Sequence, residues 1–207
     1  MDKELQKRIL SSIIILPISL FFIINGSTFF YLFLVILFLI ASYEWSKMIK
    51  KIEQKVIGIF FLLISFYAVY LTRDKGLMEF FIILTICIST DIGGYVFGKI
   101  FKGPKLAKVS PNKTYSGLIG GTLMSILLTY LIVTIYDVNF FEDLNLIFVV
   151  FLISSVSQIG DLIISYFKRI SNVKDTGKLF PGHGGLLDRI DGMIFAFPFV
   201  FIISKTL

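Results

Sequence analysis

The sequence has one cysteine, one histidine and few charged residues. Asp, Glu, Lys and Arg make up only 16% of its 207 residues, whereas hydrophobic residues make up 56%. With a mean hydropathy of +0.88, the chain is too apolar for a soluble core of this size to hide from water. The single Cys87 cannot form an internal disulfide, and we interpret it as a packing residue. These absences exclude a soluble domain and an internal disulfide framework, and they predict an all-α, polytopic integral membrane protein.

The sequence also lacks internal repeats, low-complexity stretches and linkers. We therefore expect a single membrane domain over residues 1–207, with N-terminal helices in 1–90, catalytic loops and helices in 91–192 and a last helix in 193–207. No small-residue cleavage site follows the apolar run Ile9–Ile24, so a cleaved signal peptide is not expected. The glycine spacing of a P-loop and the dinucleotide-binding fingerprint are absent too, so a nucleotide would be held in another way.

Long apolar segments account for most of the chain. A bilayer core about 30 Å thick takes ~20 helical residues to cross. By this measure the candidate spans are Arg8–Ile24, Ser27–Tyr43, Val56–Leu71, Leu77–Thr90, Ser116–Tyr136, Leu144–Phe167 and Gly192–Ile203. The fourth and the seventh are short for complete spans, so we expect them to be tilted or partly shielded by neighbouring helices.

The basic residues predict how these segments are oriented. If the N-terminus is cytoplasmic, every Lys and Arg except Arg73, Lys75 and Lys205 lies on the cytoplasmic side. The positive-inside rule then places two long polar loops, Asp91–Tyr115 and Lys168–Asp191, on the cytoplasmic side of a multi-pass protein of the cell (inner) membrane. The net charge of +6 follows from this asymmetry and suits anionic lipid, so binding to nucleic acid is not expected.

A third polar stretch, Tyr43–Lys55, contains Glu44, Trp45 and several lysines. We interpret it as an amphipathic connector at the membrane interface. Trp45 is then an aromatic belt residue. No chemistry is expected in this stretch.

The sixth apolar segment carries a polar stripe. Its polar residues recur at steps of three and four, and so share one helix face: Ser154, Ser157, Gln158, Asp161, Ser165 and Lys168. Because an ionisable residue inside an apolar helix costs a few kcal/mol, Asp161 should face protein, water or a metal rather than lipid. A functional role is favoured, and the structural alternative is a pair with a base such as Lys99 or Arg169.

Three carboxylates are candidates for a metal site. Asp188 and Asp191 are three residues apart, which predicts that both lie on one side of the helix that opens the last apolar segment. With Asp161 they supply the hard oxygen ligands that Mg²⁺ prefers when water and phosphate fill its remaining positions. A divalent cation also removes the repulsion between crowded carboxylates. We therefore expect Mg²⁺ at these three residues, and a second cation is left open.

The loop around them has groups suited to phosphate. Its Gly182–Gly185 turn can bring backbone N–H groups near an anion, although such a turn alone is a weak signal. Positive charge comes from Lys168, Arg169, Lys174 and Arg189. His183, the only histidine, is expected to bind phosphate or handle protons rather than fill a core.

The other long loop adds three candidates. It begins with Asp91 and ends near Lys113 and Thr114, which are the better candidates for contact with phosphate. Its glycines support two interpretations equally well. Gly94 and Gly98, and again Gly117 and Gly121 just after the loop, are four residues apart, a spacing that also suits close helix packing in a bilayer.

These residues resemble a known family, the phosphatidate cytidylyltransferases, also called CDP-diacylglycerol synthases. The family signature is filled at every specified position from Ser165 to Asp191. Upstream, three stretches resemble the family's acidic sites and its Ser-Pro-x-Lys-Thr stretch: Asp91 with Tyr95, Gly160-Asp161, and Ser110-Pro111 with Lys113-Thr114. The chain departs from the family pattern at Ser116, where many members have Glu, and at Gly192, where many have Ser.

The resemblance implies an enzyme of phospholipid biosynthesis that transfers CMP from CTP to phosphatidate, giving CDP-diacylglycerol and pyrophosphate. The catalytic candidates are Asp161, Asp188, Asp191, His183, Lys168 and Arg169. The substrate-binding candidates are Lys113, Thr114, Ser165, Lys174, Asp175, Gly184, Gly185, Arg189 and Asp91. The expected partners are CTP, phosphatidate and the bilayer, and a homodimer is left open.

Three alternatives compete with this interpretation. A CTP-dependent cytidylyltransferase for another lipid or a polyprenol could share the same reaction centre. A CDP-alcohol phosphotransferase is disfavoured, because only Asp188–Gly192 matches part of its pattern. A cation-coupled transporter could also bury Asp161 in a polar stripe, but the chain has no inverted repeat and its charges gather at one membrane face.

Overall fold

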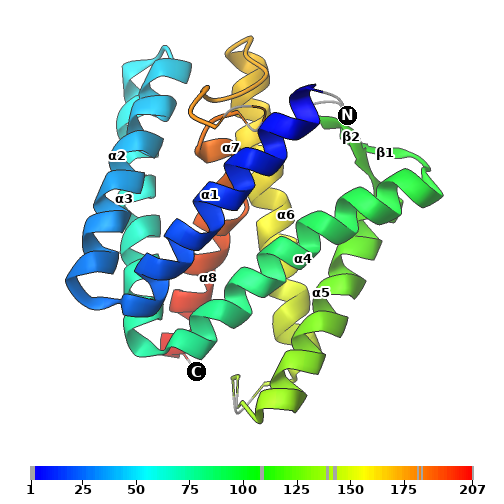
Figure 1. Cartoon of the computed structure of the whole chain (residues 1–207). Coiled ribbons are helices and arrows are strands. Elements are labelled where there is room, and N and C mark those ends of the chain that lie inside the picture. Colours follow the sequence, from blue (N-terminus) through cyan, green and yellow to red (C-terminus); the bar gives the residue numbers. More distant parts are fainter. Residues whose placement is uncertain are drawn as a thin grey trace. The chain divides into compact units, whose positions relative to one another are not determined.

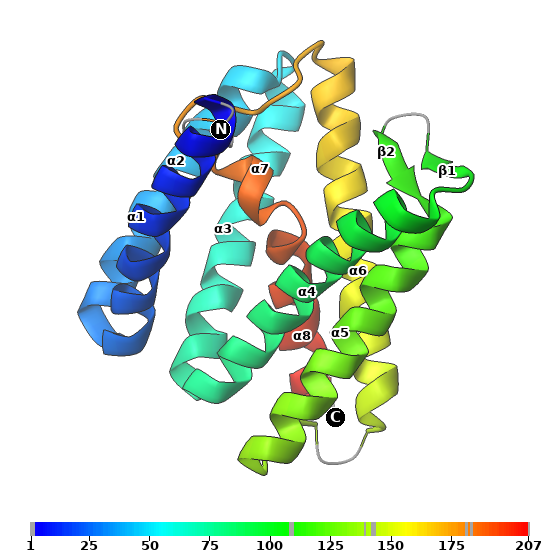
Figure 2. The ribbon, with the colours of Figure 1, turned by 45° about the vertical axis from the view of Figure 1, so that its right-hand side comes forward.

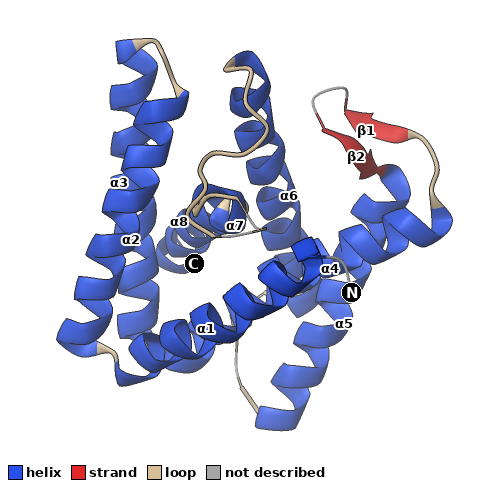
Figure 3. Cartoon of the chain, turned by 45° about the horizontal axis from the view of Figure 1, so that its top comes forward, coloured by secondary structure: helices blue, strands red, loops and turns tan. Residues whose placement is uncertain are grey.

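The computed structural model describes residues 3–107, 110–138, 140–141, 144–180, 182 and 184–206. Helices dominate it, as Figures 1 and 3 show. The elements are α1 (Lys3–Asn25), α2 (Ser27–Met48), α3 (Ile52–Lys75), α4 (Leu77–Phe101), β1 (Lys105–Ala107), β2 (Ser110–Thr114), α5 (Tyr115–Tyr136), α6 (Leu146–Ile170), α7 (Leu187–Ile190) and α8 (Met193–Thr206).

The chain forms two compact units. The first unit consists of Met1–Asp74 with Phe167–Ile190, and the second of Lys75–Tyr166 with Asp191–Leu207. The first unit thus holds α1, α2, α7 and all of α3 but its last residue. It also holds the loop of residues 171–186, which we call the signature loop. The second holds α4, the β1–β2 hairpin, α5, most of α6 and α8.

In the first unit, an arginine of α3 contacts the junction between α1 and α2. Arg73 of α3 donates from Nε to the carbonyl of Ile23 at 2.7 Å and from Nη2 to the carbonyl of Ile24 at 3.1 Å. These carbonyls belong to the last turn of α1, where intrahelical donors run out, so Arg73 caps that helix. The next turn passes through Gly26 at φ +61°, where the guanidinium leaves no room for a Cβ atom.

In the second unit, α4 and α5 lie side by side with their backbones in contact (Figure 2). A Cβ atom on Gly117 would lie 2.6 Å from the carbonyl oxygen of Gly94, and one on Gly121 would lie 2.6 Å from that of Thr90. Only glycine permits this approach. Of the two interpretations of these glycines, the structure therefore supports helix packing.

The polar stripe of α6 faces protein, as expected. The Ser154 hydroxyl accepts a hydrogen bond from Thr90 of α4 at 2.9 Å and lies 3.3 Å from the Thr122 hydroxyl of α5. Gln158 donates to Thr122 at 3.1 Å. These bonds satisfy polar groups that would be costly against lipid tails.

The all-α membrane fold is confirmed. By length and composition, the described residues contain five helices able to cross a membrane, namely α2, α3, α4, α5 and α6. Two shorter apolar helices are Ile13–Asn25 and Met193–Ser204. The seventh segment is therefore short, as expected, but the fourth is not: α4 has 25 residues and continues from Thr90 to Phe101.

Three other expectations were wrong. Asp91 lies in the extended α4 instead of a loop, and two further parts of the expected loop, Lys105–Ala107 and Ser110–Thr114, pair as antiparallel strands. Residues 43–48 continue α2, and Trp45 is not a belt residue, because it is 6% exposed and packs edge-on against Phe167 with ring centroids 4.9 Å apart.

Asp188 and Asp191 do not share a helix, since α7 ends at Ile190 and α8 begins at Met193. Gly192 disfavours a continuous helix there, and the Asp191 carboxylate accepts from its backbone N–H at 2.9 Å.

Candidate active site

In the first unit, the signature loop folds around the carboxylate of Asp188. Oδ1 of Asp188 forms an ion pair with Lys168 at 2.8 Å, and the side chains of the two residues are 6% and 12% exposed. Oδ2 accepts from the backbone N–H groups of Thr176 at 2.8 Å and Gly185 at 2.9 Å, and the Thr176 hydroxyl lies 3.0 Å away. Lys168 of α6 and the signature loop together therefore satisfy this buried charge almost completely.

The surroundings of Asp188 set its protonation. Burial alone raises the pKa of a carboxyl group, but here the hydrogen bond and charge of Lys168 and the N–H groups of Gly185 and Thr176 outweigh burial and hold the pKa of Asp188 below its ordinary value. The group is therefore anionic at neutral pH. It can act as an oxygen ligand or a charge partner, but not as a general acid.

A second carboxylate, Glu44 of α2, reaches the same loop and was missed by the sequence analysis. Its oxygens accept from the backbone N–H groups of Leu186 and Leu187 at 2.9 Å each and from the Thr176 hydroxyl at 3.0 Å. Glu44 as a whole is 4% exposed. The available signal was an acidic residue directly after a long apolar run, where a charge is costly unless it has partners.

In the second unit, Asp161 on α6 is the central carboxylate. It forms an ion pair with Lys113 of β2, and its Oδ1 lies 3.2 Å from the Ser165 hydroxyl, which donates to it. The side chains of Asp161 and Lys113 are 24% and 25% exposed. The base that pairs with Asp161 is therefore Lys113, whereas the structural alternative had suggested Lys99 or Arg169. A candidate phosphate ligand and a candidate metal ligand lie together.

The remaining upstream candidates differ in their surroundings. Thr114 is the N-cap of α5, where its hydroxyl accepts from the N–H of Gly117 at 3.1 Å. Asp91 is exposed on α4. Asp191, which follows α7 and precedes α8 in the chain, is buried.

The remaining candidates lie in the signature loop and in α7. Lys174, Asp175 and Arg189 are exposed. Gly184 has φ +86°, a left-handed conformation that favours glycine, and its N–H donates to the Phe180 carbonyl at 3.1 Å. His183 lies outside the described residues.

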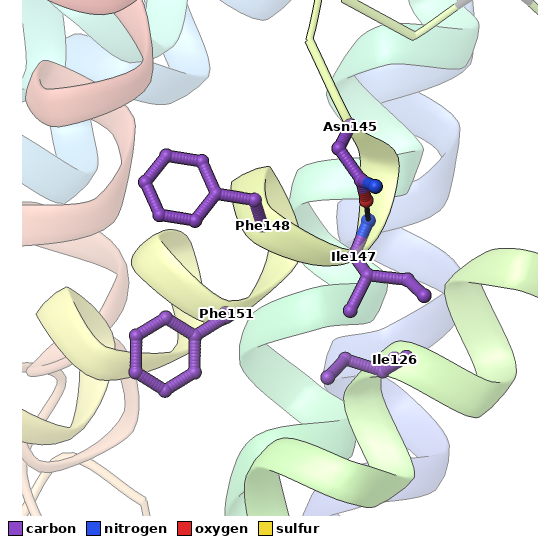
Figure 4. Close-up of a pocket in the computed structure, with 5 residues that line it drawn as sticks. All are labelled: Ile126, Asn145, Ile147, Phe148 and Phe151. Carbon is purple, nitrogen blue, oxygen red and sulfur yellow. Dashed lines mark hydrogen bonds between the residues drawn. The ribbon is translucent and has the colours of Figure 1, made fainter.

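A surface pocket of about 380 Å³ in the second unit lies elsewhere on α6 (Figure 4). It is lined by Ile126, Asn145, Ile147, Phe148 and Phe151. The Asn145 side chain accepts from the N–H of Ile147 at 2.9 Å. Phe151 precedes Asp161 by ten residues, about 15 Å along a helix, so this apolar pocket is not where the polar chemistry would occur.

A site for Mg²⁺ needs carboxylate oxygens with acceptor capacity to spare. The described residues hold no close group of three or more Asp, Glu, His or Cys side chains. A carboxylate has about four acceptor positions. The contacts of Asp161 use two of them, so this residue retains capacity for a hard cation. The expectation that Asp161, Asp188 and Asp191 hold Mg²⁺ stays a prediction.

Comparison with known proteins assigns the family. A model of the cytidylyltransferase family matches residues 50–207. A protein of Rickettsia felis named phosphatidate cytidylyltransferase is 34% identical over 213 residues, covering 98% of this chain and 94% of the relative. A protein of the same name from Rickettsia prowazekii is 36% identical, covering 98% of this chain and 93% of its own length. One from Staphylococcus saprophyticus is 40% identical over 68% of this chain and 54% of its own.

The chain therefore belongs to the cytidylyltransferase family. The resemblance found in the signature is confirmed, and the matched residues include both units' candidate carboxylates, Asp161 and Asp188.

Proposed function

We propose that this chain is a phosphatidate cytidylyltransferase. The observation that carries the proposal is the near full-length similarity to proteins of that name. The complete signature from Ser165 to Asp191 supports it independently. The reaction transfers CMP from CTP to phosphatidate and releases pyrophosphate.

The chemistry asks the protein for charge and alignment more than for a nucleophile. A phosphate oxygen of phosphatidate forms a bond to the α-phosphorus of CTP, while the bond to the oxygen that bridges the α- and β-phosphates breaks. Pyrophosphate leaves with that oxygen and its electron pair. Since the attacking phosphate is already anionic, catalysis depends on holding two polyanions in line and neutralising their charge.

The basic residues suit this task. Lys174 of the signature loop and Arg189 of α7 are exposed and would hold phosphate groups. Lys168 is largely buried against Asp188, so its role would be to fix that carboxylate as well as to add charge. Lys113 would add charge from the hairpin of the second unit.

A cation completes the proposal. Bound Mg²⁺ would neutralise the phosphates and the leaving pyrophosphate. Asp161, Asp188 and Asp191 are the residues that would hold it, since they offer the oxygen donors that this ion prefers. Asp188 is kept anionic by Lys168 and by the N–H groups of Gly185 and Thr176, so it needs no proton loss to serve as a ligand.

The finer topology and assembly also belong to the proposal. The distribution of basic residues supports a cytoplasmic active site at the cell (inner) membrane, where CTP is available. Phosphatidate would enter from the bilayer. A homodimer and a second cation stay predictions.

The test is pyrophosphate release by purified protein in detergent with phosphatidate, CTP and Mg²⁺. Release should require all three components, and it should vanish in Asp161→Asn and Asp188→Asn. The exposed Asp74→Asn is the matched control and should retain wild-type rates. If folded wild-type protein releases no pyrophosphate with phosphatidate but does so with another lipid phosphate, the acceptor is wrong. If no acceptor supports release, the enzymatic proposal is wrong.

A further inference from the structure

Glu44 is a buried charge that no part of the signature contains. It lies in α2, before the residues matched by the family model, which begin at residue 50. Burying an isolated carboxylate is strongly unfavourable unless donors compensate for the lost water. The role of Glu44 can therefore be read from the donors around it.

All the described donors to Glu44 come from one segment of the first unit. Oε1 accepts from the N–H of Leu186, and Oε2 accepts from the N–H of Leu187, each at 2.9 Å. Oε2 also lies 3.0 Å from the hydroxyl of Thr176. The Glu44 side chain therefore contacts Thr176 and Leu186, two residues of the signature loop that are ten positions apart, and also Leu187, the first residue of α7.

The glycines of the loop fit this carboxylate closely. A Cβ atom on Gly177 would lie 2.4 Å from Oε1 of Glu44. One on Gly185 would lie 2.5 Å from Oε2 and 2.6 Å from Oε1. Real Cβ atoms do not approach this closely, so the loop can surround Glu44 only because these two residues have no side chain.

Thr176 links Glu44 to the catalytic candidate Asp188. Its hydroxyl is 3.0 Å from Oε2 of Glu44 and 3.0 Å from Oδ2 of Asp188. A hydroxyl has one proton, so it donates to one carboxylate at a time. The backbone N–H groups of Thr176 and Gly185 donate to Asp188. They lie in the same residue as, or next in the chain to, the groups that donate to Glu44. Moving the loop away from Glu44 would therefore move the donors of Asp188.

We propose that Glu44 is a positioning residue for nucleotidyl transfer: it fixes the signature loop so that Asp188 and Lys168 keep their geometry. Its effect on turnover rests on the proposed function, but its hold on the loop does not. Glu44 acts through the loop and needs no contact with substrate. A carboxylate suits this position better than an amide, because Gln would direct its NH₂ group at one of two backbone N–H donors.

The test compares Glu44→Gln with Glu53→Gln, an exposed glutamate in α3 of the same unit. For Glu44→Gln, kcat should fall about 10- to 100-fold per folded enzyme, because misplacing a catalytic group by about 1 Å has effects of this size. The KM for CTP should change less, by about threefold at most, if the exposed basic residues still bind the triphosphate. Glu53→Gln should match wild type in both constants.

Hydrogen exchange provides a readout that does not depend on turnover. Peptides covering residues 184–190 should exchange faster in Glu44→Gln, while peptides of the second unit stay unchanged. Glu44→Asp keeps the charge but is one methylene shorter, so it should show a smaller effect of the same kind. If the wild type proves inactive, the proposed function fails while this exchange difference still supports the hold on the loop.

Three results would overturn the proposal. The first is a folded Glu44→Gln protein with wild-type kcat. The second is exchange that rises throughout the chain rather than in the loop. The third is failure of both Glu44 variants to fold when Glu53→Gln folds normally, which would make Glu44 a general requirement for folding.

Discussion

Among the described residues, each unit has a lysine–carboxylate pair at its candidate site, and the two pairs differ in how completely they are enclosed. In the first unit, the side chains of Lys168 and Asp188 are 12% and 6% exposed. In the second unit, those of Lys113 and Asp161 are 25% and 24% exposed. Asp188 accepts additional bonds from two backbone N–H groups, whereas the other described partner of Asp161 is one serine hydroxyl.

This difference separates two ways of using a carboxylate. Asp188 is part of the hydrogen-bonded framework of its loop, so removing its partners should disturb folding as well as chemistry. Asp161 is partly accessible and has acceptor capacity left, so it can change partners at little structural cost. Of the two carboxylates, Asp161 is the one whose described contacts leave room for another partner.

The largest expected effect is that of Lys168→Met. This change leaves the Asp188 charge buried without its ion-pair partner, which costs about 3–5 kcal/mol in comparable buried pairs. Chemical unfolding in detergent should show the loss as a lower midpoint. Lys178→Met, which changes an exposed lysine of the signature loop, is the control and should stay within about 0.5 kcal/mol of wild type. Equal midpoints for the two variants would remove the distinction between the enclosed pair and an ordinary surface charge.

Gly185→Ala should have the next largest effect. The new methyl group would lie 2.3 Å from the Thr176 hydroxyl and within 2.6 Å of both Glu44 oxygens, so the loop must shift. Forcing a group into a filled site costs about 1–3 kcal/mol. The control is Gly76→Ala, whose methyl group would meet its nearest neighbour at an ordinary 3.7 Å. If both variants unfold at the same denaturant concentration, the loop is looser than the contacts of Gly185 imply.

Thr176→Val tests the link between the two carboxylates at a smaller scale. It keeps the volume of the side chain but removes a hydroxyl that lies 3.0 Å from both Glu44 and Asp188. A hydrogen bond to a charged group contributes about 1.5–3 kcal/mol, and water can replace part of it, so we expect a loss of about 1–2 kcal/mol in unfolding. Thr176→Ser restores the hydroxyl and should recover most of this loss. A serine variant as unstable as the valine variant would show that the lost methyl group matters, rather than the hydrogen bond.

Sequence reasoning located the spans better than their ends. The apolar runs predicted the start of α2 and of α4 at the correct residues, but α4 continues to Phe101 and α2 to Met48. Hydropathy marks where lipid contact can end, whereas a helix continues as long as its backbone bonds are satisfied. Polar residues such as Asp91 and Lys99 were therefore assigned to a loop when they extend a helix.

For the site, the sequence predicted identities but not partners. The signature and the spacing of polar residues identified Asp161, Asp188 and Lys113. The pairing of Lys113 with Asp161, however, depends on a hairpin that no periodicity indicated. The bond from Thr176 to Glu44 joins residues 132 positions apart, and only the tertiary fold brings them together.

The smallest expected change in stability is that of Lys113→Met, and it gives the sharpest test of the comparison. A pair with both side chains about a quarter exposed contributes about 0–1 kcal/mol, so the unfolding midpoint should hardly move. If Lys113 also contacts substrate phosphate, pyrophosphate release should nevertheless fall by about tenfold or more, with a higher KM for CTP. Lys105→Met, in the paired strand of the same hairpin, is the control and should preserve both stability and rate. A stability loss as large as that of Lys168→Met would mean that the second pair is as much a part of the framework as the first; unchanged stability with an unchanged rate would mean that Lys113 serves neither the fold nor the phosphates.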